Sequence, residues 1–226
     1  MDILSYNPGH DGAVAMPLAD RLKAATRKLH TEAETTGFIG ALLKGEASRE
    51  GYALYLRNLL PVYEAMEKAL EHHAGGPLAC LGPPAVRRAP ALLADLRALV
   101  GPEWEGSLSL LPSSRAYAQR IAAAAAADGG FGLIGHAYTR FLGDLNGGQV
   151  LRRLLARRMQ LRPETLAFYE FPQIDDLARF AADYRARIDG LGACIPDTRL
   201  VVEEARASFS ASIAISMEVA ERAGVA

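Results

Sequence analysis

The segment from His136 to Leu151 combines residue types that could hold a flat ligand and act on it. Its apolar residues recur at helical intervals, yet Gly143, Gly147 and Gly148 lie within six positions. Each glycine costs a helix interior about 1 kcal/mol relative to alanine. At about 100° per residue, Gly143 and Gly147 lie roughly 40° apart and form a strip without side chains. Over this glycine strip a planar ligand can approach the backbone closely.

Two charged residues accompany the glycine strip. Asp144 follows Gly143 directly, and Arg140 lies one helical turn before Asp144. A carboxylate beside a bare helix face suits a large planar ligand with a polar reaction centre. The same small residues are also typical of a close contact between two helices, which is the structural alternative.

A histidine near the start of the chain could bind a metal. His30 and Glu34 are four residues apart, so they share one helix face. A carboxylate at that position fixes the tautomer of a metal-binding histidine and raises its basicity. Lys23 lies about two turns earlier on the same face, so one large ligand could contact both Lys23 and His30. An exposed histidine–glutamate pair is the alternative interpretation.

Helical patterns occupy most of the chain, and patterns typical of strands are scarce. Glycine and proline breakers separate the helical segments. The sequence therefore predicts a single all-α domain over residues 17–226, preceded by a disordered tail over residues 1–16. We expect helices at 18–35, 38–44, 48–73, 87–100, 113–127, 131–159, 174–190 and 196–223.

The composition is that of an ordinary globular protein. The chain has 226 residues, 50% of them hydrophobic and 23% charged, with a net charge of −1. This balance predicts no nucleic-acid partner. The absence of a long apolar run predicts no membrane anchor, and the first residues lack the pattern of a secretory signal. Cys80 and Cys194 are far apart and have no metal-ligand spacing, which indicates a reduced, cytoplasmic protein.

Taken together, the two chemical segments resemble those of the haem oxygenases. The resemblance covers most of the chain, and its most specific part is the glycine-rich segment 136–151. The other matching segments are Leu-His-Thr-Glu-Ala-Glu at 29–34, Lys-Gly at 44–45, residues 62–67, Phe-Pro at 171–172 and Tyr-Arg-Ala-Arg at 184–187.

The resemblance implies an all-α bundle in which haem is sandwiched between a proximal helix and a glycine-kinked distal helix. Haem b, iron protoporphyrin IX, would be both substrate and cofactor. The family uses dioxygen and electrons from an external donor to open haem to biliverdin, with release of carbon monoxide and ferrous iron. The donor would be a ferredoxin, a flavodoxin-like protein or a reductase.

The resemblance assigns roles to residues on both sides of the haem. His30 resembles the proximal iron ligand, and Glu34 resembles the carboxylate that supports it. Gly143 and Gly147 match the distal strip whose backbone crosses the haem face.

Further matches concern protons and haem orientation. Asp144 resembles the distal carboxylate that holds a water network, to which Arg140 and Tyr63 also belong. The residues that match the propionate anchors are Lys23, Tyr138 and Arg185. With these anchors we expect cleavage at the α-meso carbon, which gives biliverdin IXα.

Two features limit how far the family's propionate anchors can be carried over to this sequence. The family often has a lysine one turn before the arginine at 185, and here that position is Ala181. The contact that this lysine makes with a haem propionate is therefore either absent or supplied by Arg179 or Arg187. In addition, Tyr138 lies about 160° from Arg140 on an ideal helix, so it reaches a propionate only if the helix is irregular around Gly143 or if the haem edge lies near the N-terminal end of this helix.

Two other functions compete with the haem oxygenase interpretation. A non-catalytic haem-binding or haem-delivery protein would need His30 and the pocket but not Asp144. Helical proteins that act on thiamine-type substrates would not need the glycine strip together with His30. We expect the remaining histidines, His10, His72, His73 and His136, to be structural or solvated.

Overall fold

The computed structural model describes residues 16–225 of the chain. The predicted disordered tail, residues 1–16, lies outside the described residues except for Met16. Within the described range every regular element is helical, which confirms the all-α prediction. The α-helices are α1 (Leu18–Thr35), α2 (Gly37–Lys44), α3 (Arg49–His72), α4 (Ala89–Val100), α5 (Trp104–Ser107), α6 (Pro112–Ala126), α7 (Leu133–Arg158), α8 (Leu177–Leu191) and α9 (Thr198–Ala223).

All eight predicted helices are present, with bounds within three residues of the prediction. The short helix α5 and six 3₁₀ turns were not predicted. Helices α8 and α9 begin three and two residues later than expected, because an aspartate caps each of them. The side chain of Asp176 accepts a hydrogen bond from the Arg179 amide, and that of Asp197 accepts one from the Arg199 amide. These caps satisfy amides of the first turn and so fix the starts of α8 and α9.

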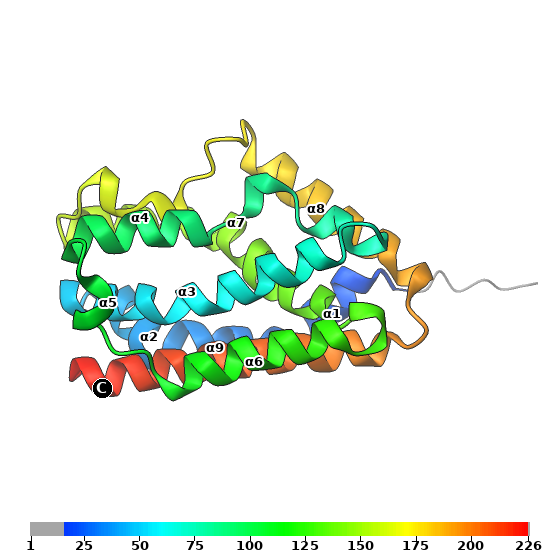
Figure 1. The fold of residues 1–226 in the computed structure, drawn as a ribbon, viewed down its shortest axis with the longest axis horizontal. Coiled ribbons are helices and arrows are strands. Elements are labelled where there is room, and N and C mark those ends of the chain that lie inside the picture. The colour runs from blue at the N-terminus through cyan, green and yellow to red at the C-terminus, as the bar shows by residue number, and fades with distance from the viewer. Residues whose placement is uncertain (1–15, 226) are drawn as a thin grey trace, which may run out of the picture.

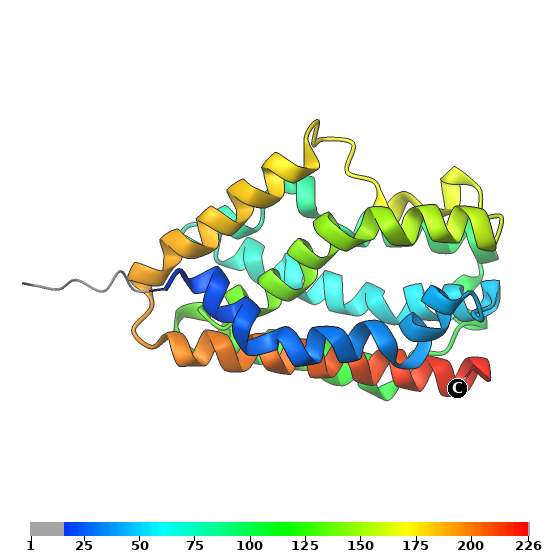
Figure 2. The ribbon, with the colours of Figure 1, turned by 180° about the vertical axis from the view of Figure 1, so that it is seen from behind.

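Helix α9 connects the two halves of the bundle. It packs against α1 and α2 and also against α6 and α7. Figures 1 and 2 show α9 running along one edge of the molecule, with α6 beside it in one view and α1 in the other. Helix α3 crosses the interior and buries Tyr52, Leu56, Tyr63 and Met66 in the core. The bundle thereby holds α1 and α7 in fixed relation to a common support.

At Gly135, α7 approaches the backbone of α9 closely. A Cβ atom at this position would lie 2.5 Å from the Ala205 amide nitrogen and 2.6 Å from the Val201 carbonyl oxygen. These atoms belong to the α9 backbone, which cannot move aside as a flexible side chain can. Gly135 therefore sets the distance between the two helices.

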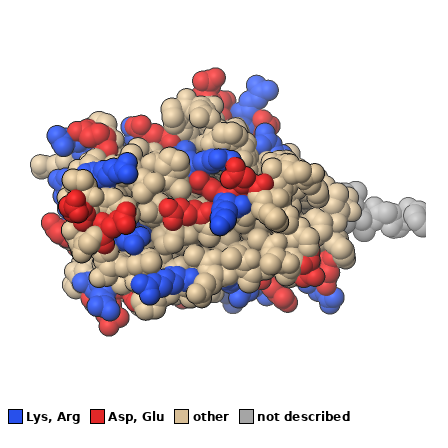
Figure 3. Space-filling model, in the orientation of Figure 1, with Lys and Arg blue, Asp and Glu red and all other residues tan. Residues whose placement is uncertain are grey.

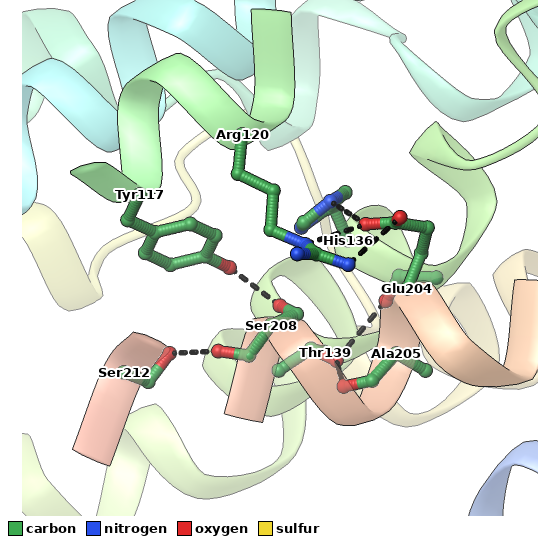
Figure 4. Close-up of polar contacts among 9 residues, drawn as sticks. Tyr117, Arg120, His136, Thr139, Glu204, Ala205, Ser208 and Ser212 are labelled. Atoms are coloured by element: carbon green, nitrogen blue, oxygen red, sulfur yellow. Dashed lines mark hydrogen bonds and ion pairs between the residues drawn. The ribbon is translucent and has the colours of Figure 1, made fainter. Parts of the chain in front are cut away.

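Next to this crossing lies a polar cluster around the buried His136, shown in Figure 4. The His136 side chain is fully buried, and its Nε2 lies 3.0 Å from a carboxylate oxygen of Glu204. The Arg120 guanidinium donates to both Glu204 oxygens at 2.9 and 3.0 Å. His136 therefore joins α7 to α9 and α6, in agreement with the predicted structural role.

The surface shows no segregation of charge on the face seen in Figure 3, where acidic and basic side chains are interspersed. Among the described helices, none combines the length and the apolar character that crossing a membrane requires.

The Gly135 contact generates a stability prediction. Replacing Gly135 with alanine should lower the free energy of unfolding by about 1–3 kcal/mol, because the added methyl group meets backbone atoms of α9. Thermal unfolding should show a melting temperature lower by roughly 2–4 °C per kcal/mol. Gly190→Ala in α8 is the control, since a Cβ there meets nothing within 4 Å. Equal melting temperatures for the two variants would contradict this role of Gly135.

Candidate active site

A cavity of about 440 Å³ lies between α1 and α7. Its volume falls in the range of small-molecule sites, about 300–1,000 Å³. Nine of the ten residues predicted from the sequence line this cavity. They are Lys23, His30 and Glu34 of α1, Tyr138, Arg140, Gly143, Asp144 and Gly147 of α7, and Arg185 of α8. The tenth, Tyr63 of α3, hydrogen-bonds to Asp144 from the core side.

The C-terminal half of α1 has little protein covering it. The buried residues of α1 are Leu18, Ala19, Leu22 and Thr26, and none follows Thr26. The His30 side chain is 57% exposed, although its ring centroid lies 5.8 Å from that of Phe209. Nδ1 of His30 lies 3.4 Å from a carboxylate oxygen of Glu34, so Nε2 is the nitrogen available to a ligand.

The glycine strip of α7 also faces open space. A Cβ atom at Gly143 or Gly147 would meet nothing within 4 Å, which rules out a helix–helix contact as the reason for these two glycines. Gly148 differs, since its Cβ would lie 3.3 Å from the Tyr169 ring. Two glycines therefore leave the cavity wall bare, and the third makes room for a neighbouring aromatic ring.

Helix α7 is continuous from Leu133 to Arg158, and Figure 2 shows that it changes direction along its length. Tyr138 and Arg140 both line the cavity despite their separation on an ideal helical wheel. The bend agrees with the kink expected for a glycine-containing helix.

A compact set of hydrogen bonds holds the buried carboxylate of Asp144. The Tyr63 hydroxyl donates to Oδ2 of Asp144 at 2.5 Å. The Arg140 guanidinium donates in turn to the Tyr63 oxygen from Nη2 at 2.7 Å and from Nε at 3.1 Å. Nη2 of Arg140 also lies 3.8 Å from Oδ1 of Asp144, and both of these side chains are only 11% exposed. The carboxylate is therefore fixed beside the glycine strip.

Burial changes the acidity of this carboxyl group. It raises the pKa of Asp144, whereas the charge of Arg140 and the hydrogen bond from Tyr63 lower it, and the net direction is upward. Burial likewise raises the pKa of Tyr63 well above its ordinary value. A carboxyl group with a raised pKa can hold and release a proton nearer to neutral pH.

Residues of α6 and α9 that the sequence did not reveal support Arg140. Its Nη1 lies 3.4 Å from the Ser212 hydroxyl, which donates to the Ser208 carbonyl at 2.8 Å. The Tyr117 hydroxyl pairs with that of Ser208, as Figure 4 shows. No local spacing links these residues to α7, since only the tertiary fold brings them together.

The cationic side of the cavity contains Lys23, Arg185 and Tyr138. Burial raises the pKa of Tyr138, while a hydrogen bond to Thr26 and the charge of Arg185 oppose this rise. Arg27, one turn after Lys23, also lines the cavity and was not predicted.

Ala181, the position at which the family often has a lysine, does not line the cavity. It is 5% exposed and belongs to the core. Arg187 donates to the Cys80 carbonyl at 3.2 Å and lies over the Phe180 ring, 5.6 Å from its centre. Neither Arg187 nor Arg179 is among the described residues that line the cavity.

Comparison with known proteins agrees with this geometry. The Heme oxygenase family model matches residues 16–218. Heme oxygenase 1 of Nostoc is 36% identical over 204 residues, covering 89% of this chain and 85% of its own. Human heme oxygenase 1 is 33% identical and covers 90% and 72% of the two chains.

Solved structures give the same picture. Heme oxygenase-1 of Synechocystis in complex with heme superposes with a TM-score of 0.83 at 32% identity, covering 92% and 94% of the two chains. The heme oxygenase of Leptospira interrogans gives a TM-score of 0.81 at 32% identity, covering 90% and 100%. Agreement in both sequence and fold over this length shows that the chain belongs to the haem oxygenase family.

Proposed function

We propose that this enzyme opens haem oxidatively to biliverdin, with release of carbon monoxide and ferrous iron. Haem would occupy the cavity between α1 and α7. The observation that carries this proposal is the pairing, across one cavity, of an uncovered histidine with a glycine strip that no protein atom fills. Bound haem supplies the iron at which dioxygen reacts, and the protein supplies orientation and protons.

On the α1 side, His30 is the proposed ligand of the haem iron through Nε2. The Glu34 carboxylate, 3.4 Å from Nδ1, would favour the tautomer with its proton on Nδ1 and raise the basicity of the ring. A neutral histidine ligand leaves the opposite face of the iron open to dioxygen.

On the α7 side, Gly143 and Gly147 allow the backbone to cross the haem face closely. Because neither glycine places a side chain over the metal, dioxygen can lean toward the edge of the ring. Asp144 stands at the side of this space and, with Tyr63 and Arg140 fixing it, can organise water and deliver a proton.

At the propionate side, Lys23, Tyr138 and Arg185 are the proposed anchors. They set the rotation of haem in its plane and hence the carbon that is attacked. We infer cleavage at the α-meso position, which gives biliverdin IXα.

Electrons come in this proposal from a ferredoxin, a flavodoxin-like protein or a reductase, and the reaction takes place in the cytoplasm. A haem carrier without activity would need His30 and the cavity. It would have no use for the buried Asp144–Tyr63–Arg140 set, which favours the enzyme.

The direct test is to add haemin to the purified protein, followed by ascorbate or a reductase system. Loss of the Soret band with appearance of the biliverdin absorption supports the proposal. A stable haem complex that never yields biliverdin with any of these reductants would contradict it.

Replacing His30 with alanine should abolish turnover while leaving part of the haem affinity, because burial of the macrocycle contributes much of that affinity. Imidazole added to the variant should restore activity by occupying the vacated position. His72→Ala, at the exposed end of α3, serves as the control. An unchanged rate in His30→Ala would show that another group binds the iron.

Replacing Asp144 with alanine should leave the haem affinity nearly unchanged and lower biliverdin formation by about 10²-fold or more, the usual contribution of a proton-transferring group. Asp175→Ala removes an exposed carboxylate and is the matched control. Haem titration and product absorption are the two measurements. Biliverdin at the wild-type rate would mean that a different group supplies the proton.

Double replacement of Lys23 and Arg185 with alanine should yield mixed biliverdin isomers. Each charge-assisted contact contributes about 1.5–3 kcal/mol, and a difference of ~1.4 kcal/mol between two haem orientations gives tenfold selectivity. Chromatography of the product measures the isomer ratio, with Lys68→Ala/Arg115→Ala, two exposed residues away from the cavity, as a control of equal charge. A wild-type product rich in the β or δ isomer would refute the proposed seating.

A further inference from the structure

Arg88 is a buried cation at the start of α4. Its side chain is 5% exposed, and its guanidinium lies 4.0 Å from the centre of the Phe171 ring. Nη1 donates to the Phe168 carbonyl at 3.1 Å and also to the Glu170 carbonyl. Nε is buried and has no hydrogen-bond partner. None of the ion pairs in the described part of the chain includes Arg88.

A buried charge without a direct counter-ion is costly, so negative groups farther away must stabilise it. Burial lowers the pKa of Arg88, and among the groups that oppose this change Asp144 acts most strongly. Glu67 and Asp95 act more weakly. The carboxylate of Glu67 accepts from the backbone amides of Arg88 and Ala89, which fixes the start of α4.

Arg88 and Asp95 together hold one short segment from two sides. Asp95 accepts hydrogen bonds from the amides of Ala167 and Phe168 at 2.7 and 2.9 Å. Arg88 binds the carbonyl groups of Phe168 and Glu170. The 3₁₀ turn Ala167–Tyr169 is thus attached to α4 through both its donors and its acceptors.

The same turn forms part of the active-site wall. Phe168 and Tyr169 line the cavity, and the Phe168 ring meets that of Tyr63 edge-on at 5.4 Å. The Tyr169 carbonyl accepts from Gln149 of α7 at 2.7 Å. The turn therefore lies against Tyr63, which hydrogen-bonds to Asp144, and against the helix that contains the glycine strip.

From this arrangement we infer that Arg88 is a positioning residue of the distal site, because it clamps the 168–170 backbone behind Tyr63, which hydrogen-bonds to Asp144. The inference rests on the proposed function of Asp144. Arg88 itself does not line the cavity.

Two substitutions of Arg88 weaken its grip on the turn. Arg88→Lys keeps the charge but loses the planar group that lies over Phe171 and the second nitrogen, which donates to the Ala85 carbonyl, and Arg88→Gln loses the charge as well. Arg87→Gln is the matched control, because Arg87 is the exposed neighbour that faces Glu71 on the surface. Should Arg88→Gln not fold, Arg88→Met, which keeps packing on Phe171, takes its place.

Both readouts use the haem-free protein. Infrared titration of the Asp144 carboxyl band, assigned with Asp144→Asn, should show its midpoint raised by about 0.5–1 pH unit in both Arg88 variants, because a released turn no longer holds Tyr63 against Asp144 and the hydrogen bond from Tyr63 favours the ionised acid. The midpoint should stay in place in Arg87→Gln. An unchanged midpoint in both Arg88 variants overturns the positioning role of Arg88.

Hydrogen–deuterium exchange tests the clamp. Amides of residues 167–171 should exchange about tenfold faster in both Arg88 variants and not in Arg87→Gln. Unchanged exchange in both Arg88 variants overturns the clamp. The proposed role of Asp144 fails separately, if Asp144→Ala makes biliverdin at the wild-type rate.

Discussion

The site depends on the way α9 holds α1 and α7 on opposite sides of a space that the protein does not fill. At Gly135, α7 approaches α9 so closely that a methyl group would meet backbone atoms. Farther along α9, Ser216 fixes the α1–α2 corner, because its hydroxyl accepts from the Ile39 amide at 3.1 Å and donates to the Thr36 carbonyl at 3.4 Å. Because α7 and the α1–α2 corner are both attached to α9, the cavity walls that α1 and α7 form cannot collapse onto each other.

This constraint explains the uneven burial of α1. A helix of a globular protein normally buries one whole face. Helix α1 buries its face only as far as Thr26, and the turn with His30 remains open to the cavity. On the other wall, Gly143 and Gly147 lower the stability of helix α7, and no protein group packs against them in return. Both features leave apolar space that a large planar substrate would fill.

Electrostatics concentrates on the α7 side of the cavity. Asp144 is buried, and its pKa would rise further without Arg140 and Tyr63. Those two residues depend in turn on contacts with α6 and α9. The acidity of the proposed proton donor is therefore adjusted by groups from several helices, which is why spacing along the sequence does not reveal its environment.

The sequence by itself determined the helices and the residues of the two walls. Periodicity and breakers located eight helices within three residues, because helix formation depends on local pattern and on caps such as Asp176 and Asp197. The helical spacing of His30 and Glu34, and of Gly143 and Gly147, is also local. Only the tertiary structure decided that the two glycines face a cavity and Gly148 a ring, and that Ala181 belongs to the core. It alone brought Ser212, Tyr117 and Arg88 toward Asp144, because contacts between distant segments depend on packing that no local spacing encodes.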